Sequence, residues 1–175
     1  TLSDEDGNIS LEKEALTLES LALAMATRNS GGKIAVQVEK KVKNGSINPK
    51  LVGIPSIFVD YVVVCSDAKY HHQTFGTEYD ETFVNSSILV NDLKKKSALD
   101  ESKIIARRCA MFLSKDDKIL NYGIGMPEGI AEVLKDGNQE HLFTPTVEPG
   151  AIGGTPAGGL SFGASVTPQA IIDQP

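Results

Sequence analysis

The sequence contains no tryptophan, only two cysteines among its 175 residues, and no excess of basic side chains. Seventeen Lys and Arg residues stand against twenty-three Asp and Glu residues, which gives a formal net charge of −6. Nucleic-acid-binding proteins usually present a basic face, so this charge balance argues against nucleic acid as a partner. Cys65 and Cys109 lack the spacing of a metal site, and we expect two packed, reduced thiols in a cytoplasmic protein.

Long apolar runs are also missing. The stretch 21–26 is among the longest, far short of the roughly 20 residues that a membrane span requires, and no signal peptide is visible. The composition, with 41% apolar and 23% charged residues, is that of a globular protein without a membrane partner. Because the chain begins at Thr1 and ends at Pro175, we expect it to be an internal piece of a longer protein.

The first half of the chain predicts one helix followed by two strands. Ser10 can cap a helix whose apolar residues recur at helical spacing, and the segment 29–32 (Asn-Ser-Gly-Gly) ends it. Strands are predicted at 34–39 and 57–65. The second run is β-branched and almost continuously apolar, which is typical of a strand covered on both faces in a parallel sheet.

The second half predicts another α/β unit. Residues 76–99 have the scattered charges and polar residues of a connector. Asp100 then caps a helix with a shared apolar face at Ile104, Ile105, Cys109, Phe112 and Leu113; a strand at 119–122, a helix from Pro127 to about 136 and a strand at 142–147 follow. This order predicts the α/β class, with parts of two domains at residues 1–75 and 100–175.

Two glycine-rich turns follow strands of this second unit, where ligand sites of open α/β sheets gather. The first is Gly123-Ile124-Gly125-Met126-Pro127-Glu128-Gly129. Its backbone N–H groups and the following helix N-terminus favour a phosphate, a carboxylate or an oxyanion. A plain tight turn is the alternative interpretation, because neither a dinucleotide fingerprint nor a P-loop is present.

The second turn is Glu148-Pro149-Gly150-Ala151-Ile152-Gly153-Gly154. A lone glutamate at the end of an apolar strand is unusual, because a buried carboxylate is costly unless it is bonded or functional. Pro149 biases Glu148 toward an extended conformation, so its side chain is expected to project from the strand end. On position alone, a surface glutamate beside a flexible loop remains the alternative.

The two turns together resemble the family I CoA-transferases, in particular the acetate/propionate and 3-ketoacid group. The resemblance rests on Gly-Ile-Gly-Met-Pro-Glu-Gly at 123–129 and Thr-Val-Glu-Pro-Gly-Ala-Ile-Gly-Gly at 146–154. It extends to Gly-Gly-Leu-Ser-Phe-Gly at 158–163 and His-Gln-Thr at 72–74, and covers nearly the whole chain. Pro145 within a strand, best placed at a bulge or sheet edge, and Thr167 in place of the usual Asn are departures from the family pattern.

The resemblance implies a three-layer αβα fold with open, mostly parallel sheets, and a ping-pong transfer of CoA between carboxylic acids. Glu148 would be the nucleophile that carries CoA as a glutamyl thioester. Residues Gly123, Gly125, Met126 and Pro127 would bind the oxyanion or substrate, and Gly150, Gly153 and Gly154 would bind CoA. The implied partners are acyl-CoA and short-chain carboxylic acids, with no permanent cofactor and no metal, in a homo-oligomer. The isolated chain is expected to be inactive.

A second hypothesis needs no catalysis. The same α/β layout occurs in sugar-phosphate isomerases and in ligand-sensing domains, and fold does not fix function. In that case the 123–129 turn would bind a phosphate and Glu148 would be incidental. A third possibility is a folded remnant without activity. The Glu-Pro-Gly-x-x-Gly-Gly run favours the transferase, because a sensor has no need of an exposed carboxylate there.

Overall fold

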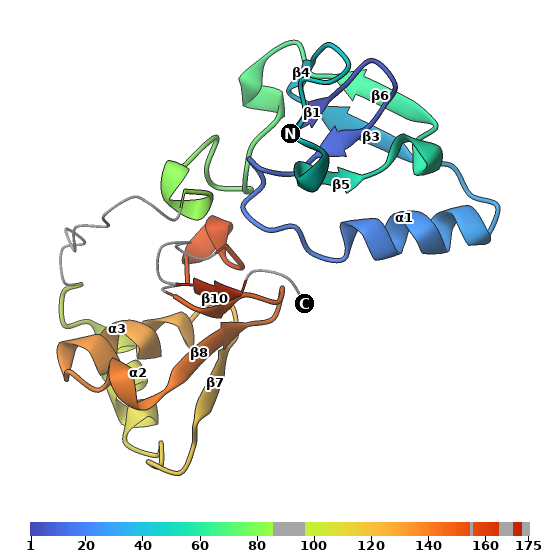
Figure 1. Ribbon diagram of the computed structural model, residues 1–175. Helices are drawn as coiled ribbons and strands as arrows, with labels where there is room; N and C mark the ends of the chain where they lie inside the picture. The colour runs from blue at the N-terminus through green and yellow to red at the C-terminus, as the bar shows by residue number, and fades with distance from the viewer. Residues whose placement is uncertain (86–96, 155, 165–169, 173–175) are drawn as a thin grey trace. The chain divides into compact units, whose positions relative to one another are not determined.

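A computed structural model describes residues 1–85, 97–154, 156–164 and 170–172 (Figure 1). The chain divides into two compact units, Thr1–Asp80 and Glu81–Pro175. The division falls within the predicted connector 76–99, of which residues 86–96 lie outside the described part, as does Thr167. Each unit has its own strands and at least one helix.

The first unit contains two small sheets. One has the strand order β4-β1-β2-β5 and mixes parallel and antiparallel pairs, and the other pairs β3 with β6 in parallel. The strands are β1 (Leu2–Ser3), β2 (Ile9–Ser10), β3 (Ala35–Val38), β4 (Lys40–Lys41), β5 (Val52–Ile54) and β6 (Tyr61–Val64); the helices are α1 (Ser20–Asn29) and the 3₁₀ turns η1 (Pro49–Leu51), η2 (Ser56–Phe58) and η3 (Ala68–Tyr70). Helix α1 packs against β5 and η2.

The first helix begins nine residues later than predicted, with Glu19 and not Ser10 at its N-cap position. Ser10 lies in β2, and its hydroxyl accepts a hydrogen bond from the Leu2 N–H at 3.2 Å instead of capping a helix. The Asp4 carboxylate closes the β1–β2 turn by accepting the backbone N–H of Asn8 at 2.8 Å, which draws Ser10 into the sheet. The predicted end of the helix is confirmed. Gly31 there has a φ of +74°, a conformation that glycine adopts readily.

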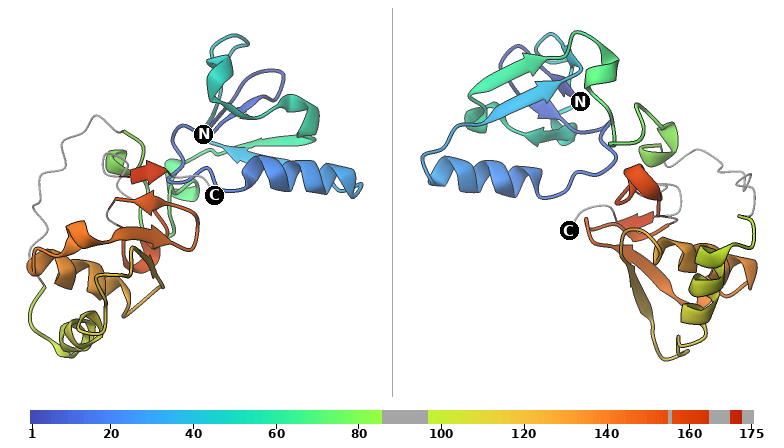
Figure 2. Two further views of the ribbon diagram at one scale, coloured as in Figure 1. Left: turned by 60° about the horizontal axis from the view of Figure 1, so that its bottom comes forward. Right: turned by 180° about the vertical axis from the view of Figure 1, so that it is seen from behind.

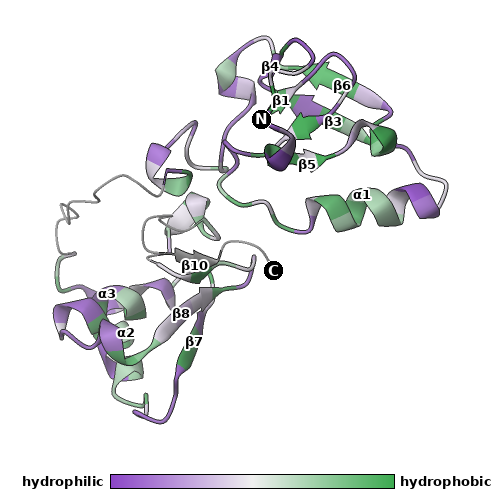
Figure 3. Ribbon diagram, in the orientation of Figure 1, coloured by the Kyte–Doolittle hydropathy of each residue, from purple (hydrophilic) through white to green (hydrophobic). Residues whose placement is uncertain are grey.

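Strands β3 and β6 pair in parallel, as expected from their apolar runs, but one face is uncovered. The predicted strand 57–65 is shorter than expected, because Ser56–Phe58 form the 3₁₀ turn η2 and β6 covers only Tyr61–Val64. Val36 and Val62 pack against a buried core of Ile9, Ala24, Val38 and Ile54. On the other face Tyr61 and Val63 are 59% and 53% exposed, so the expectation of a strand covered on both faces is wrong for this chain. Figure 3 shows β6 and much of α1 in the colours of hydrophobic residues.

Asp60 fixes the point where the parallel pair begins. Its carboxylate accepts the Ile34 N–H at 2.9 Å and lies 3.1 Å from the Lys33 ammonium and 3.3 Å from the Arg28 guanidinium. The Ile34 N–H, followed by Lys33, holds the pKa of Asp60 below its ordinary value of 3.8. The charged carboxylate therefore stabilises the start of β3 above that pH, and the stabilisation is lost as the pH falls through the lowered pKa.

Replacing Asp60 with alanine is expected to loosen the start of β3. At pH 7, amide hydrogen exchange in a peptide covering residues 33–38 should be roughly tenfold faster in Asp60→Ala, because a charge-assisted hydrogen bond is lost. The difference from the wild type, compared at equal pH, should narrow below pH 3.8 as the wild-type carboxyl protonates. Asp67→Ala is the control, because among the described residues the Asp67 carboxylate contacts only Lys69, whose backbone N–H it accepts at 3.1 Å and whose ammonium lies 3.0 Å away. Equal exchange in Asp60→Ala and Asp67→Ala at pH 7 would refute this role.

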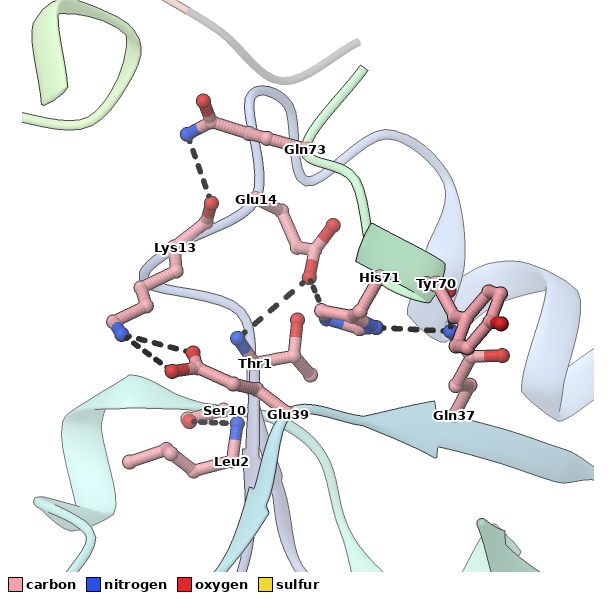
Figure 4. Close-up of polar contacts among 10 residues, drawn as sticks. All are labelled: Thr1, Leu2, Ser10, Lys13, Glu14, Gln37, Glu39, Tyr70, His71 and Gln73. Carbon is pink, nitrogen blue, oxygen red and sulfur yellow. Dashed lines mark hydrogen bonds and ion pairs between the residues drawn. The ribbon is translucent and has the colours of Figure 1, made fainter. Parts of the chain in front are cut away.

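A polar cluster ties the segment after β6 back to the start of the unit (Figure 4). The Gln37 amide lies 3.1 Å from His71 Nδ1 and donates to the Tyr70 carbonyl at 2.8 Å, while His71 Nε2 lies 3.8 Å from the Glu14 carboxylate. Gln73, which belongs to the His-Gln-Thr segment of the resemblance, donates to the Lys13 carbonyl at 3.0 Å. These bonds give the segment 70–73 a structural function within the first unit.

The second unit places a four-stranded sheet beside two packed helices. The sheet order is β10-β9-β8-β7, with β7 and β8 parallel and the other two pairs antiparallel. The strands are β7 (Ile119–Tyr122), β8 (Thr144–Val147), β9 (Ile152–Gly153) and β10 (Ala170–Ile172); the helices are α2 (Glu101–Ala110), α3 (Glu128–Asp136) and the 3₁₀ turns η4 (Glu81–Phe83), η5 (Glu140–Leu142) and η6 (Gly159–Ser161). Helices α2 and α3 pack on each other and stay together in both further views (Figure 2).

Helix α2 starts where predicted but buries a different face. The Asp100 carboxylate accepts the Lys103 N–H at 2.8 Å and caps the helix. Ile104 and Phe112, which were expected to pack, are 55% and 80% exposed, and Ala106 is buried instead. A Cβ added at Gly129 of α3 would lie 3.3 Å from the Ala106 Cβ, so these small residues let the two helices approach closely.

Lys103 completes the contact between the two helices. Its ammonium lies 2.7 Å from Asp136 and 2.9 Å from Glu132, both on α3. Asp136 and then Glu132 raise the pKa of Lys103, and Lys103 lowers the pKa of Glu132. A pattern of apolar spacing alone could not predict this face, because the buried group is the stem of a charged side chain whose head is paired.

The predicted α/β class is confirmed, and the described sheets are mixed, with parallel pairing in their longest strand pairs. The parallel pairs β3–β6 and β7–β8 are those expected from apolar runs, whereas most of the antiparallel pairing involves strands of two or three residues. Cys65 and Cys109 are both free thiols, but Cys109 is exposed and not packed. Among the described residues, no helix has the length and apolarity to cross a membrane, and no group of His, Cys, Asp and Glu could hold a metal ion.

Candidate active site

The parallel pair β7–β8 brings the two predicted turns to one edge of the sheet. Tyr122 and Val147 are partners in the register, and both are buried. Gly123 and Glu148 directly follow them, so the glycine turn and the glutamate leave adjacent strands side by side. This is the carboxyl end of a parallel pair, where ligand sites of α/β sheets occur.

Glu148 stands in a tight turn after β8. The Gly150 N–H donates to the Val147 carbonyl at 3.0 Å, and the Val147 N–H donates to the Ala151 carbonyl at 3.1 Å, so the chain reverses around Glu148 and Pro149. Gly150 has a φ of +117°, which glycine tolerates and other residues rarely adopt. The Glu148 side chain is exposed, and its carboxylate has no hydrogen bond or ion pair with the part of the chain that the structure describes.

Pro145 fits this sheet without a bulge in the β7–β8 register. It lies opposite Leu120, and the Thr144 N–H donates to the Lys118 carbonyl at 2.8 Å. The β8–β9 ladder has a single pair, Thr146 with Ile152, and the next bond from β8 on that side comes from Val147. The residue without an N–H therefore precedes the part of β8 that is bonded to β9, so its missing donor interrupts neither ladder.

In the 123–127 turn, the described residues already use the backbone N–H of Gly125 but not that of Met126. Gly125 has a φ of +89°, and its N–H donates to Oε1 of Glu128 at 2.8 Å. The Met126 N–H has no hydrogen bond to the described residues, and its side chain is 59% exposed. Pro127 caps α3 as its N-cap residue and has no side-chain hydrogen bond there.

A third glycine segment, residues 158–163, packs against the turn that carries Glu148. A Cβ added at Gly163, whose φ is +104°, would lie 2.7 Å from the Pro149 Cγ. The Gly159 N–H donates to Oε2 of Glu128 at 3.0 Å, and a Cβ at Gly158 would meet the same oxygen at 2.7 Å. Glu128 and these packing glycines were not identified as site residues from the sequence, although Glu128 is part of the Gly-Ile-Gly-Met-Pro-Glu-Gly motif.

The remaining predicted site residues lie in β9 and after it. Gly153 belongs to β9 and is buried, with a φ of +76°, and Gly154 follows with a φ of +73°.

Exposed apolar side chains accompany the glycine segments: Ile124 is 66% and Leu160 is 68% exposed. Tyr122 is 5% exposed, and burial raises the pKa of its phenol, so it packs as a neutral side chain.

The second unit is thus an α/β unit with an exposed carboxylate, Glu148, at the end of a strand and near two glycine-rich segments. No protein-family model matches the chain. Individual proteins do: the chain is 41% identical over 99% of its length to caffeate CoA-transferase of Acetobacterium woodii, and 36% identical to acetate CoA-transferase YdiF of Escherichia coli O157:H7. It spans about a third of these relatives, 33% and 32% of their lengths.

Solved structures agree with the sequence comparison. The chain superimposes with a TM-score of 0.78 on an acyl-CoA transferase (YdiF) of E. coli O157:H7, in a thioester complex with CoA, at 32% identity. The apoenzyme of the same protein gives a TM-score of 0.73 at 33% identity. The alignments cover 99% of this chain and 32% and 31% of those chains. The chain is thus homologous, over its whole length, to CoA-transferases, which are enzymes of the transferase class.

Proposed function

We propose that this chain is part of an enzyme that transfers CoA between an acyl-CoA and a carboxylic acid, with Glu148 as the nucleophile. The observation that carries the proposal is the exposed Glu148 carboxylate after β8, which has no hydrogen bond or ion pair with the described residues, in a chain homologous to CoA-transferases. A thioester complex with CoA is known for the similar protein YdiF, which supports a covalent mechanism. The sugar-phosphate hypothesis has no comparable support.

The proposed reaction begins with nucleophilic attack of the Glu148 carboxylate on the thioester of an acyl-CoA. A Glu148 oxygen attacks the acyl carbonyl and expels CoA as a thiolate, which leaves a mixed acyl-glutamyl anhydride. The thiolate then attacks the glutamyl carbonyl, the anhydride C–O bond breaks, and the acyl group departs as a carboxylate. CoA remains on Glu148 as a thioester. An incoming carboxylate reverses these steps, so no oxidant, reductant or net proton transfer is required.

Each tetrahedral intermediate in this sequence carries an oxyanion that needs a donor. The Met126 N–H suits this function because it is not bonded to the described residues and belongs to the turn beside Glu148. One well-placed donor of this kind contributes about 10²–10³ in rate. The Gly125 N–H, in contrast, is already bonded to Glu128, so its contribution is to hold the shape of the turn together with Gly123 and Pro127.

The glycines after Glu148 leave space for the pantetheine arm of CoA. Gly150, Gly153 and Gly154 all have positive φ, so the chain folds back without side chains at these positions. Ile124 and Leu160 supply apolar surface for a short acyl group. Short-chain acyl-CoA and short-chain carboxylic acids are the proposed substrates, without a resident cofactor. The homo-oligomer and the cytoplasmic location remain predictions from the sequence.

The test uses the full-length protein that contains this sequence. Incubation with an acyl-CoA should add the mass of one CoA, mapped to the peptide that carries Glu148 and released by hydroxylamine. An adduct on another residue would overturn the assignment of Glu148. Binding of a sugar phosphate without any adduct would favour the non-catalytic hypothesis instead.

A further inference from the structure

Glu128 joins two glycine segments with one carboxylate. Its Oε1 accepts the Gly125 N–H at 2.8 Å, and its Oε2 accepts the Gly159 N–H at 3.0 Å. The two donors are 34 residues apart in the chain, so no local turn could bring them together. Glu128 is the first residue of α3, where the positive end of the helix dipole favours a negative charge.

Both joined segments lie next to the turn that carries Glu148. The segment 123–127 leaves β7 beside Glu148, because Tyr122 and Val147 are register partners. The segment 158–163 contacts the turn of Glu148 at Pro149, because Gly163 packs on the proline ring. Glu128 is therefore linked to the neighbourhood of Glu148 through both segments, without contacting Glu148 itself.

Internal hydrogen bonds connect the two ends of the segment 158–163, so a bond that holds one end also restrains the other. The Ser161 N–H donates to the Gly158 carbonyl at 3.2 Å, and the Ala164 N–H donates to the Ser161 carbonyl at 3.2 Å. The Ala157 N–H closes the loop on the Ala164 carbonyl at 2.8 Å. Holding Gly159 thus holds Gly163, and through Gly163 the position of Pro149.

We propose that Glu128 is a positioning residue for thioester formation: its carboxylate fixes both glycine segments, and thereby the aim of Glu148 and of the Met126 N–H. The proposal rests on the proposed function of Glu148. It requires both oxygens, one for each segment. A glutamine at this position keeps one acceptor but turns an amide N–H₂ toward the other backbone N–H, so one of the two bonds is lost.

The test is single-turnover formation of the CoA adduct in the full-length protein. For Glu128→Gln, the rate constant should fall by about 10²-fold, the cost of displacing reacting groups by about 1 Å. The KM for acyl-CoA should change much less, and the adduct should still map to Glu148. Glu128→Asp keeps the charge but is too short to reach both segments, so it should be slow as well.

Glu132→Gln is the matched control, because it makes the same chemical change one turn later on α3. Glu132 pairs with Lys103 at 2.9 Å and contacts neither glycine segment. This variant should unfold at a lower temperature and form the adduct at the wild-type rate. Partial unfolding of any variant lowers the amount of adduct and not the rate constant, which separates a positioning effect from a loss of folded protein.

The outcomes distinguish this inference from the proposed function. If the wild type forms no adduct, the proposed function fails. If the wild type forms the adduct and Glu128→Gln forms it at the same rate, Glu128 has no positioning function. If Glu128→Asp restores the wild-type rate, charge at the helix N-terminus suffices and the two-segment bridge is refuted.

Discussion

Replacing Glu148 with alanine in the full-length protein is expected to abolish the CoA adduct and to reduce transfer by a factor on the order of 10⁶, as when a covalent nucleophile is removed from an enzyme. The fold should be unaffected. The Glu148 side chain is exposed, and its carboxylate makes no hydrogen bond or ion pair with the described residues, so its removal should change stability by only about 0.5 kcal/mol. Intact-mass measurement and a steady-state transfer assay check both expectations.

Glu140→Ala provides the comparison for Glu148→Ala. Glu140 is an exposed glutamate of η5, just before the strand that leads to Glu148, and it does not belong to the candidate active site. Its replacement should leave both the adduct and the transfer rate unchanged. Full activity in Glu148→Ala, or an adduct that survives the substitution, would disprove the nucleophilic assignment.

The second large effect is expected from Gly163→Ala. The new Cβ would lie 2.7 Å from the Pro149 Cγ, and the φ of +104° is strained for alanine in any surroundings. Overpacking of this kind costs about 1–3 kcal/mol of stability. Because Pro149 follows Glu148 directly, the clash should also displace the carboxylate, and the rate of adduct formation should fall by about 10²-fold.

A control and a rescue separate the clash from the backbone strain. Gly45 has a φ of +79° but no atom within 4 Å of an added Cβ, so Gly45→Ala tests strain alone and should leave adduct formation unchanged. Combining Gly163→Ala with Pro149→Ala removes the ring atoms that the new methyl group meets. The double variant should form the adduct faster than expected if the effects of the two single substitutions on the activation free energy were additive. Strict additivity would indicate that Gly163 and Pro149 do not act on Glu148 through their contact.

The arrangement around Glu148 suits its proposed function as a nucleophile. The glutamate is exposed because its turn leaves the sheet, while the strand behind it ends on the buried Val147. Pairing of β7 with β8 and the hydrogen bonds within residues 157–164 hold the surrounding backbone, and the carboxylate itself is exposed to solvent. Energy for the reaction is expected from binding the remote parts of CoA, since Glu148 has no partner in the described chain that would activate it.

Local patterns predicted the elements with strong apolar runs and clear end signals. The strand at 119–122, the helix that Asp100 caps and the parallel strands around 36 and 62 are confirmed in the structure. The prediction for Ser10 was wrong, because a serine can either cap a helix or lie in a strand, and local sequence does not distinguish the two. Here the turn at Asp4–Asn8 brings Ser10 beside Leu2 in a sheet. Short strands such as β1 and β4 have too few residues for any periodicity to identify them.

The sequence alone determined the family resemblance and, through it, the proposal for Glu148, because the motifs 123–129 and 146–154 are contiguous segments of the chain. Only the tertiary structure decided which groups surround that glutamate. It paired Tyr122 with Val147, joined Gly125 to Gly159 through Glu128, and placed Gly163 on Pro149. These contacts connect residues between 14 and 34 positions apart, and they depend on chain packing and not on local propensity.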